Sequence, residues 1–158
     1  LEIARVVGEA IRDRWGDEEL PDRFRSFDTI CSATQDRQDA VLDLMQNEPD
    51  MMLVIGGYNS SNTTNLANIC SDHVPTYHIE TDRSIDTAKG TISHKQVGTG
   101  SIVEESDWLP LEGELVIGLT AGASTPDSLI GRTVERILLS LGEDPELVLA
   151  EAMTSTTE

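Results

Sequence analysis

A chain of 158 residues is long enough to fold around a substantial hydrophobic core. Its 29 acidic residues outnumber its 11 basic residues and give a formal net charge of −18, so the sequence offers no basic patch for nucleic acid and would be repelled by an anionic membrane surface. The apolar runs stay well short of the roughly 20 residues that span a bilayer.

Residues 3–15 open the chain with an amphipathic pattern. Ile3, Val7, Ala10 and Ile11 fall on one face at helical spacing, which predicts an α-helix. The chain does not begin with Met, has no signal-peptide pattern and starts inside this helical pattern. We therefore expect a part of a longer protein with a cytoplasmic location.

Short β-prone runs follow, each typical of a buried strand. Three of them, at 27–31, 52–55 and 115–120, precede a loop of small polar residues and then a helical pattern. A fourth run, 76–79, precedes a polar stretch at 80–100 that is interpreted as a loop or a weak helix. Apolar strands that alternate with helices predict the α/β class, with a small parallel sheet flanked by helices.

The helical patterns after the three loops each present an apolar face. The last of them opens with Pro and Asp behind a Ser-Thr pair, which is a typical helix start. The tail after Leu141 is predicted to hold one short helix. The residues expected to face inward are Ala40, Val41, Leu44 and Met45 in the first helix, Leu66, Ala67, Ile69 and Cys70 in the second, and Ile130, Val134, Ile137 and Leu138 in the third.

The loops between these strands and helices form the candidate site. In a parallel sheet they emerge at one edge, and each delivers a helix N-terminus whose free N–H groups favour phosphate or diphosphate. The run 59–65 supplies seven consecutive short polar side chains, more than one helix cap requires. The alternative, that these residues are ordinary helix caps, stays open. The sequence contains neither a Walker P-loop nor a complete GxGxxG motif.

The cysteines and histidines do not predict a self-contained metal site. Cys31 and Cys70 have no CxxC spacing, and His73, His78 and His94 do not lie at ligand spacing with either cysteine. Cys70 falls on an apolar helix face and is interpreted as a small buried hydrophobe. The three histidines are interpreted as surface or hinge residues.

Three strings carry a family resemblance. Residues 27–38 (FDTICSATQDRQ) resemble the cluster-cysteine motif of the LytB/IspH family, residues 56–63 (GGYNSSNT) resemble its diphosphate-binding segment, and residues 120–127 (TAGASTPD) resemble its third signature. The strings occur in the family's order. The resemblance covers residues 1–140 and fits the long variant of plants and cyanobacteria best.

The resemblance implies a reductase of isoprenoid biosynthesis that converts 4-hydroxy-3-methylbut-2-enyl diphosphate to isopentenyl and dimethylallyl diphosphate. Cys31 would be one of three cysteine ligands of a [4Fe–4S] cluster, and Ser60, Ser61, Asn62 and Ser124 would hydrogen-bond the substrate diphosphate. Electrons would come from a donor such as ferredoxin or flavodoxin. The location would be the bacterial cytoplasm, or the plastid stroma in a plant.

The sequence also lacks several functional residues of the family. Its other two cysteine ligands, its substrate-binding histidines and its proton-delivering glutamate lie in N-terminal domains that have no counterpart in this sequence. We therefore expect a fragment that is inactive alone, one lobe of a three-domain trefoil. In that arrangement residues 1–26 close the preceding domain, residues 27–141 form the C-terminal α/β domain and residues 142–158 form a tail.

Two alternatives to the reductase stay open. One is a stand-alone flavodoxin-like module that binds a phosphorylated small molecule without redox chemistry, and for it Cys31 would be dispensable. The other is a segment that only packs against partner domains and aggregates alone. An upstream reading frame with two further cysteines would favour the reductase, whereas a start codon close to Leu1 would favour the module.

Overall fold

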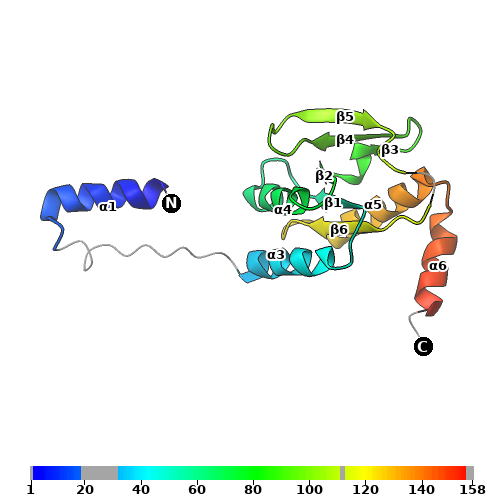
Figure 1. Cartoon of the computed structure of the whole chain (residues 1–158), viewed down its shortest axis with the longest axis horizontal. Coiled ribbons are helices and arrows are strands. Elements are labelled where there is room, and N and C mark those ends of the chain that lie inside the picture. Colours follow the sequence, from blue (N-terminus) through cyan, green and yellow to red (C-terminus); the bar gives the residue numbers. More distant parts are fainter. Residues whose placement is uncertain (1, 19–31, 111–112, 156–158) are drawn as a thin grey trace. The chain divides into compact units, whose positions relative to one another are not determined.

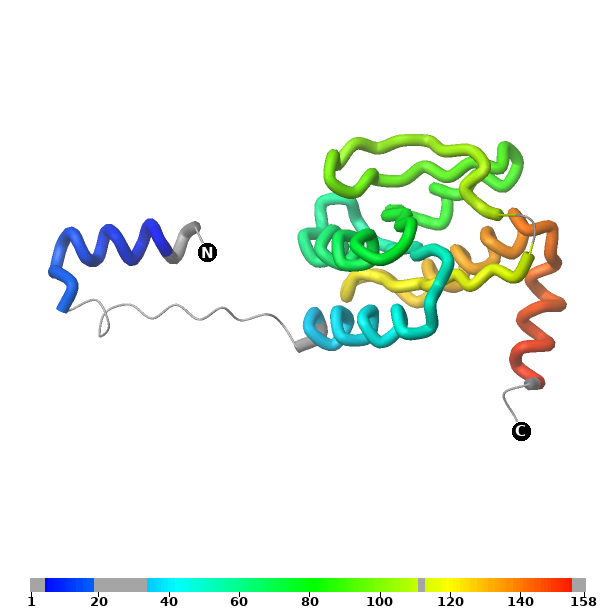
Figure 2. Tube along the Cα trace, viewed as in Figure 1, coloured from blue at the N-terminus to red at the C-terminus, as the bar shows by residue number. Residues whose placement is uncertain are grey.

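The computed structural model describes residues 2–18, 32–110 and 113–155 (Figure 1). The chain divides into two compact units, residues 1–32 and residues 33–158. Figure 2 traces the backbone of both units from the N-terminus to the C-terminus. The strands of the described residues all belong to the second unit.

The described part of the first unit contains one helix, α1 (Glu2–Trp15), which confirms the helix predicted from its apolar spacing. Gly16 follows it with a φ of 85°, the left-handed conformation in which many helices end. Arg5 and Glu9, one helical turn apart, form an exposed salt bridge of 2.7 Å. The strand predicted at 27–31 lies outside the described residues.

A mixed sheet forms the centre of the second unit (Figure 1). Its strands are β1 (Met51–Ile55), β2 (Thr76–Ile79), β3 (Ile85–Asp86), β4 (Thr91–Lys95), β5 (Ile102–Ser106) and β6 (Ile117–Ala121). They lie in the order β3-β4-β2-β1-β6, and β5 pairs with β4. The predicted parallel sheet is confirmed for β2, β1 and β6, whereas β4 runs antiparallel to β2, β3 and β5.

Strand β1 lies at the centre of the core because helices cover both of its faces. The helices of this unit are α3 (Ser32–Met45), α4 (Ser61–Ser71), α5 (Asp127–Ser140) and α6 (Pro145–Ser155). All five residues of β1 are buried, and alternate side chains point to opposite faces. Met52 and Val54 pack against α3 and α4, while Leu53 and Ile55 pack with residues of α5. This arrangement confirms the α/β class.

The three predicted helices and the short helix of the tail are all present as α3, α4, α5 and α6. Their predicted inward residues are buried or partly buried, with one exception. Ala40 on α3 is exposed, which corrects its prediction as an inward residue. Successive helix positions lie about 100° apart, and the neighbouring Val41 takes the buried position at 1% exposure.

The stretch 80–100 is not the loop or weak helix that its composition predicts. It forms a short 3-10 helix at Asp82–Ser84, followed by β3 and β4. Burial alternates along β4, with Ile92 and His94 pointing inward. The alternation of inward and outward residues that is typical of a strand is therefore present in the sequence. It is a weak signal, because its inward residues are one isoleucine and one histidine. The burial of His94 depends on packing against other strands.

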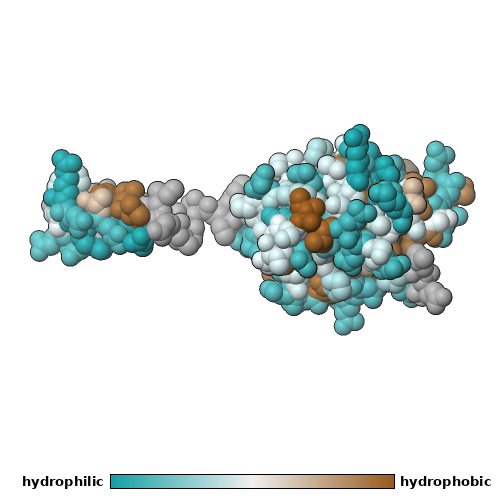
Figure 3. Space-filling model, turned by 90° about the horizontal axis from the view of Figure 1, so that it is seen from above, coloured by the Kyte–Doolittle hydropathy of each residue, from teal (hydrophilic) through white to brown (hydrophobic). Residues whose placement is uncertain are grey.

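The outer edge of the sheet is polar. Seen from above the view of Figure 1, where β4 and β5 lie uppermost, the second unit is mostly hydrophilic or intermediate, with small hydrophobic areas (Figure 3). Among the described strands β5 pairs only with β4, and it carries exposed Glu104 and Glu105. Charged side chains on an edge strand oppose pairing with other chains.

Gly118 on β6 occupies a place where a larger side chain cannot fit. A Cβ there would overlap the sulfur of Met52, which is fully buried, and would lie 3.2 Å from Cδ2 of Leu44. We expect Gly118→Ala to lower the free energy of unfolding, measured by urea denaturation, by about 1–3 kcal/mol, the usual cost of overpacking a core.

Gly131→Ala is the matched control. Gly131 lies inside α5, and a Cβ there would meet nothing within 4 Å. The substitution should raise the free energy of unfolding by about 0.5–1 kcal/mol because alanine favours the helix over glycine. If both substitutions changed the free energy of unfolding in the same direction, the packing described at Gly118 would be contradicted.

Candidate functional site

The carboxyl ends of β1 and β6 meet at one edge of the sheet, where Ile55 and Ala121 are partners in register. The carbonyl oxygen of Ile55 accepts two hydrogen bonds from the loop after β6. The N–H of Gly122 donates at 2.9 Å and Oγ1 of Thr125 donates at 3.1 Å. One backbone oxygen therefore fixes the two loops to each other.

Two glycines allow these loops to approach closely. A Cβ at Gly122 would overlap Oγ1 of Thr63, and a Cβ at Gly56 would lie 2.8 Å from the same oxygen. Gly56 also has a φ of 153°, in the range that favours glycine. Thr63 is 1% exposed and fills the space between the two loops. Side chains at positions 56 and 122 would push it out.

The first turn of α4 carries three of the predicted site residues. Ser60 is the N-cap, and its side chain accepts a hydrogen bond from the N–H of Thr63 at 3.3 Å. Ser61 is exposed, and the amide of Asn62 donates to Oγ1 of Thr34 at the start of α3 at 2.6 Å. This bond ties the first helix start to the second, so the predicted convergence of the loops at one edge is confirmed for the described residues.

The other two predicted site residues are Ser124 and Cys31. Ser124 is exposed in the loop between β6 and α5. It lies at the same edge as the start of α4, because Gly122 and Thr125 on either side of it contact the loop after β1. Cys31 lies outside the described residues. Four of the five predicted residues therefore lie at one edge of the sheet.

The start of α5 is less capped than the start of α4. Its N-cap is Pro126, and no side chain of the described residues forms a cap hydrogen bond there. The N–H of Leu129 donates to the carbonyl oxygen of Pro126 at 2.9 Å, so among the described residues the N–H groups of Asp127 and Ser128 are left for solvent or for a ligand.

Three supporting residues were not predicted from the sequence. Thr34 holds the amide of Asn62, Thr63 separates the two glycines, and Nη1 of Arg37 donates to the carbonyl oxygen of Ala121 at 3.1 Å. Each of them acts on a residue of another loop or strand. Thr34 and Arg37 lie in the string 27–38 and Thr63 lies in the string 56–63, but the resemblance implied no role for them. The density of Thr, Ser and Asn around the helix starts was the other signal in the sequence.

Comparison with known proteins assigns the family. The model of the family described as LytB protein matches residues 2–138. The chain belongs to the LytB family. The resemblance predicted from the three strings is thereby confirmed.

The relatives are longer than this chain. Proteins named 4-hydroxy-3-methylbut-2-enyl diphosphate reductase are 43% identical over 137 residues in Trichormus variabilis and 40% identical over 149 residues in Picosynechococcus sp.. These matches cover 86% and 93% of this chain but 33% and 36% of the relatives, so the chain spans about a third of their length. A solved structure of (E)-4-hydroxy-3-methyl-but-2-enyl diphosphate reductase is 30% identical, with a TM-score of 0.47 over 79% of this chain and 38% of that chain.

Two histidines of this LytB-family chain are buried. His78 and His94 are 1% and 6% exposed, which corrects their interpretation as surface or hinge residues, whereas His73 is exposed. Nε2 of His78 lies 3.0 Å from the carbonyl oxygen of Gly56. Because a carbonyl oxygen only accepts, Nε2 carries the hydrogen. Burial lowers the pKa of His78 below its usual value, so the ring is a neutral donor near pH 7.

Cys70 is confirmed as a small buried hydrophobe. It is fully buried, and burial raises the pKa of its thiol to about 11, so it lacks the thiolate that binds metals. Among the residues that the structure describes, no group of three or more His, Cys, Asp or Glu side chains could hold a metal ion. The helices of the described ranges are all too short or too polar to cross a membrane.

The lowered pKa of His78 makes stability depend on pH. In the unfolded chain this pKa returns to about 6.5, so near and below that pH the unfolded state binds a proton that the folded state does not. The stability that neutral His78 contributes is present above about pH 6.5 and is lost as the pH falls below it. We expect His78→Gln to have a smaller loss of thermal stability than the wild type between about pH 7 and about pH 5.

His73→Gln is the control for this measurement, because His73 is exposed in the same region of the chain. It should keep the pH dependence of the wild type. Glutamine at position 78 keeps an amide donor for the carbonyl of Gly56, so the comparison isolates the titration from the hydrogen bond. Identical pH profiles for His78→Gln and the wild type would refute this assignment.

Proposed function

We propose that this chain is part of a 4-hydroxy-3-methylbut-2-enyl diphosphate reductase, an iron–sulfur oxidoreductase of isoprenoid biosynthesis that forms isopentenyl and dimethylallyl diphosphate. Membership of the LytB family and the names of the relatives support the activity. The observation that carries the proposal for the described residues is the meeting of the loops and helix starts at one sheet edge. Such an edge suits the diphosphate of the substrate.

In this proposal the diphosphate is bound by Ser60, Ser61, Asn62 and Ser124. The N-termini of α4 and α5 direct N–H donors and the positive ends of their dipoles to the same edge. Ser60 accepts a bond from the N–H of Thr63, which leaves its O–H to donate to a phosphate oxygen. Local donors are needed because a chain with a net charge of −18 repels anions overall.

Cys31 is proposed as one of three cysteine ligands of a [4Fe–4S] cluster. The described residues do not fit a complete cluster site, because Cys70 is buried in the core and no group of three ligands occurs among them. The other two thiolates, the substrate-binding histidines and the proton-delivering glutamate would come from N-terminal domains. When bound, the cluster would transfer electrons to the substrate from a donor such as ferredoxin or flavodoxin.

The proposal extends to the arrangement of the whole protein. Residues 27–141 would form the C-terminal domain of a three-domain trefoil, residues 1–26 would close the preceding domain and residues 142–158 would form a tail. The division of the chain between residues 32 and 33 supports a boundary near the start of α3. A bacterial cytoplasmic location, or the plastid stroma in a plant, belongs to the same proposal.

A flavodoxin-like binding module without redox chemistry is the second candidate. It is favoured by the observation that residues 33–158 form one compact unit with hydrophobic clusters on both faces of β1. In such a module Cys31 would be dispensable. The reading frame upstream of Leu1 would then lack the two further cysteines that the reductase requires.

Cys31→Ser in the full-length protein is expected to remove both the cluster and the reductase activity, because a serine does not replace the thiolate. The measurements are the visible absorbance of the cluster and the turnover of the substrate. Cys70→Ala is the control and should keep the cluster, since the thiol of Cys70 is buried in the core. The 158-residue chain alone should be colourless and inactive.

A brown preparation of the chain alone, with the absorbance of a stable cluster, would contradict the assignment of a single cluster ligand to it. Full activity of Cys31→Ser would favour the binding module instead.

Ser61→Ala and Ser124→Ala in the full-length protein should each weaken substrate binding about tenfold or more, because a hydrogen bond to a charged oxygen is worth roughly 1.5–3 kcal/mol. Ser71→Ala is the matched control, since Ser71 is an exposed serine at the opposite end of α4. Equilibrium binding of the substrate is the measurement. If Ser124→Ala binds as tightly as Ser71→Ala, Ser124 is only a loop residue.

A further inference from the structure

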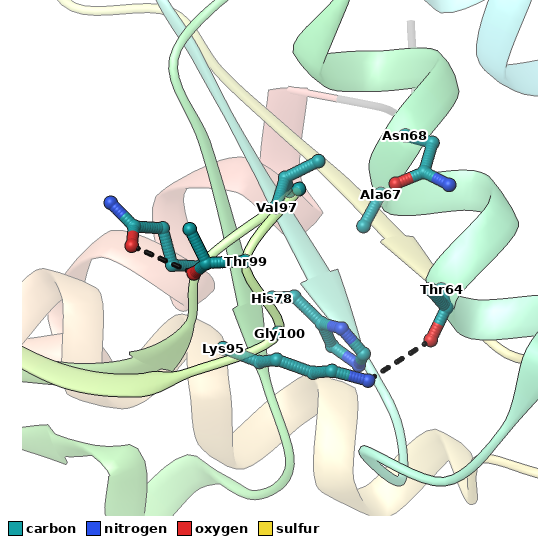
Figure 4. Close-up of a pocket in the computed structure, with 10 residues that line it drawn as sticks. Thr64, Ala67, Asn68, His78, Lys95, Val97, Thr99 and Gly100 are labelled. Atoms are coloured by element: carbon teal, nitrogen blue, oxygen red, sulfur yellow. Dashed lines mark hydrogen bonds between the residues drawn. The ribbon is translucent and has the colours of Figure 1, made fainter.

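A pocket of about 270 Å³ lies between α4, β2 and the turn that joins β4 to β5 (Figure 4). His78 and Lys95 are register partners on β2 and β4, and both line the pocket. In Figure 4 the side chain of Lys95 extends toward Thr64 on α4, with the ring of His78 beside it. Their polar atoms reach the loop that joins β1 to α4.

Lys95 contacts this loop and the helix that follows it. Its Nζ donates to the carbonyl oxygen of Tyr58 at 2.7 Å and lies 3.5 Å from Oγ1 of Thr64. The shorter contact is a charge-assisted hydrogen bond. Tyr58 precedes and Thr64 follows the segment 60–62, which carries three of the residues proposed to bind the diphosphate. Lys95 therefore holds this segment from both sides.

His78 holds the beginning of the same loop. Its Nε2 donates to the carbonyl oxygen of Gly56 at 3.0 Å, and its ring meets the ring of Tyr58 edge-on with 5.3 Å between centroids. The hydroxyl of Tyr58 donates to the carbonyl oxygen of Ser93 on β4 at 3.4 Å. The loop is thus attached to β2 and β4 by hydrogen bonds and by a ring contact.

These attachments orient two backbone amides. In a planar trans peptide the C=O and the following N–H point in opposite directions, and no cis peptide bond occurs among the described residues. The carbonyls of Gly56 and Tyr58 point to the attaching side chains, so the N–H groups of Gly57 and Asn59 point the other way. Within the described residues neither N–H donates to an acceptor. Such unpaired donors in a loop are suited to a phosphate oxygen.

We propose that Lys95 and His78 are positioning residues of the diphosphate site, which hold residues 56–59 so that the N–H groups of Gly57 and Asn59 face the substrate. This inference rests on the proposed function and deepens it, because it adds residues to the same site. In this inference Lys95 acts through the loop, because the shorter contact of its ammonium group, 2.7 Å, is with the carbonyl oxygen of Tyr58. The antiparallel strand β4 thereby becomes part of the binding machinery.

The two lysines of the chain provide a matched pair of variants. Lys95→Met removes the attachment, and Lys89→Met removes the same charge from an exposed position beside Asp86. With inorganic pyrophosphate as the probe and calorimetry as the measurement, the affinity of the 158-residue chain should fall about tenfold in Lys95→Met and by less than about twofold in Lys89→Met. Lys95→Arg, which keeps a charged donor, should recover part of the affinity.

Hydrogen exchange without any ligand tests the attachment itself. The amides of Ser60 and Thr64 are hydrogen-bonded within the loop and the first turn of α4. Their exchange should be faster in Lys95→Met than in the wild type and unchanged in Lys89→Met. Unchanged exchange together with unchanged pyrophosphate affinity in Lys95→Met would overturn the inference.

The salt dependence of pyrophosphate binding distinguishes a positioning role of Lys95 from direct attraction between its charge and the anion. A positioning role keeps the ratio of the wild-type and Lys95→Met affinities the same in about 0.1 M and about 1 M KCl, whereas direct attraction of the anion is screened. A ratio that falls to one at high salt would overturn the positioning role.

A wild-type chain that binds no pyrophosphate would count against the proposed diphosphate site and not against the attachment. In that case faster exchange in Lys95→Met still supports the role of Lys95 in holding the loop, and unchanged exchange overturns it. If circular dichroism shows that Lys95→Met does not fold, Lys95→Gln, which keeps an uncharged donor, carries both measurements.

Discussion

The carbonyl oxygen of Ile55 is the atom on which the candidate site depends. It lies at the end of the buried strand β1 and accepts both the N–H of Gly122 and the hydroxyl of Thr125. A buried carbonyl with two donors is well satisfied, and the same two bonds join the loops after β1 and β6. Glycine at positions 56 and 122 makes them possible, because Thr63 then fits between the loops. The exposed hydroxyls of this edge are held in place by that contact.

The two kinds of strand in the sheet have different roles at this edge. The parallel strands β2, β1 and β6 bring the loops and the helix starts together, as parallel strands do in other α/β sheets. The antiparallel strand β4 contacts the loop after β1 from another side, through Lys95 and through the hydroxyl of Tyr58. The loop is therefore held by β1 before it, by α4 after it and by the antiparallel strand β4.

The charge of the chain is consistent with a site built from neutral donors. At a net charge of −18 the overall field opposes an anionic ligand, so close-range donors must compensate for it. Two cations near the loops are engaged with the protein: Arg37 donates to the carbonyl of Ala121, and Lys95 donates to the carbonyl of Tyr58. Hydroxyl, amide and N–H donors at the helix starts remain for a ligand. In the proposed site, these two charged side chains hold the loops, whereas neutral donors would contact the ligand.

The sequence by itself determined the parallel core, the helices that cover it and the family, because apolar periodicity and the three motifs are local patterns. Strand β4 escaped prediction because its inward residues are one isoleucine and one histidine, and the burial of His78 and His94 depends on neighbouring strands. Only the tertiary structure decided that Asn62 bonds to Thr34, 28 residues away, and that Lys95 bonds to Tyr58, 37 residues away. Such pairs follow from strand register and helix packing, which bring distant residues together and leave no periodic trace in the chain.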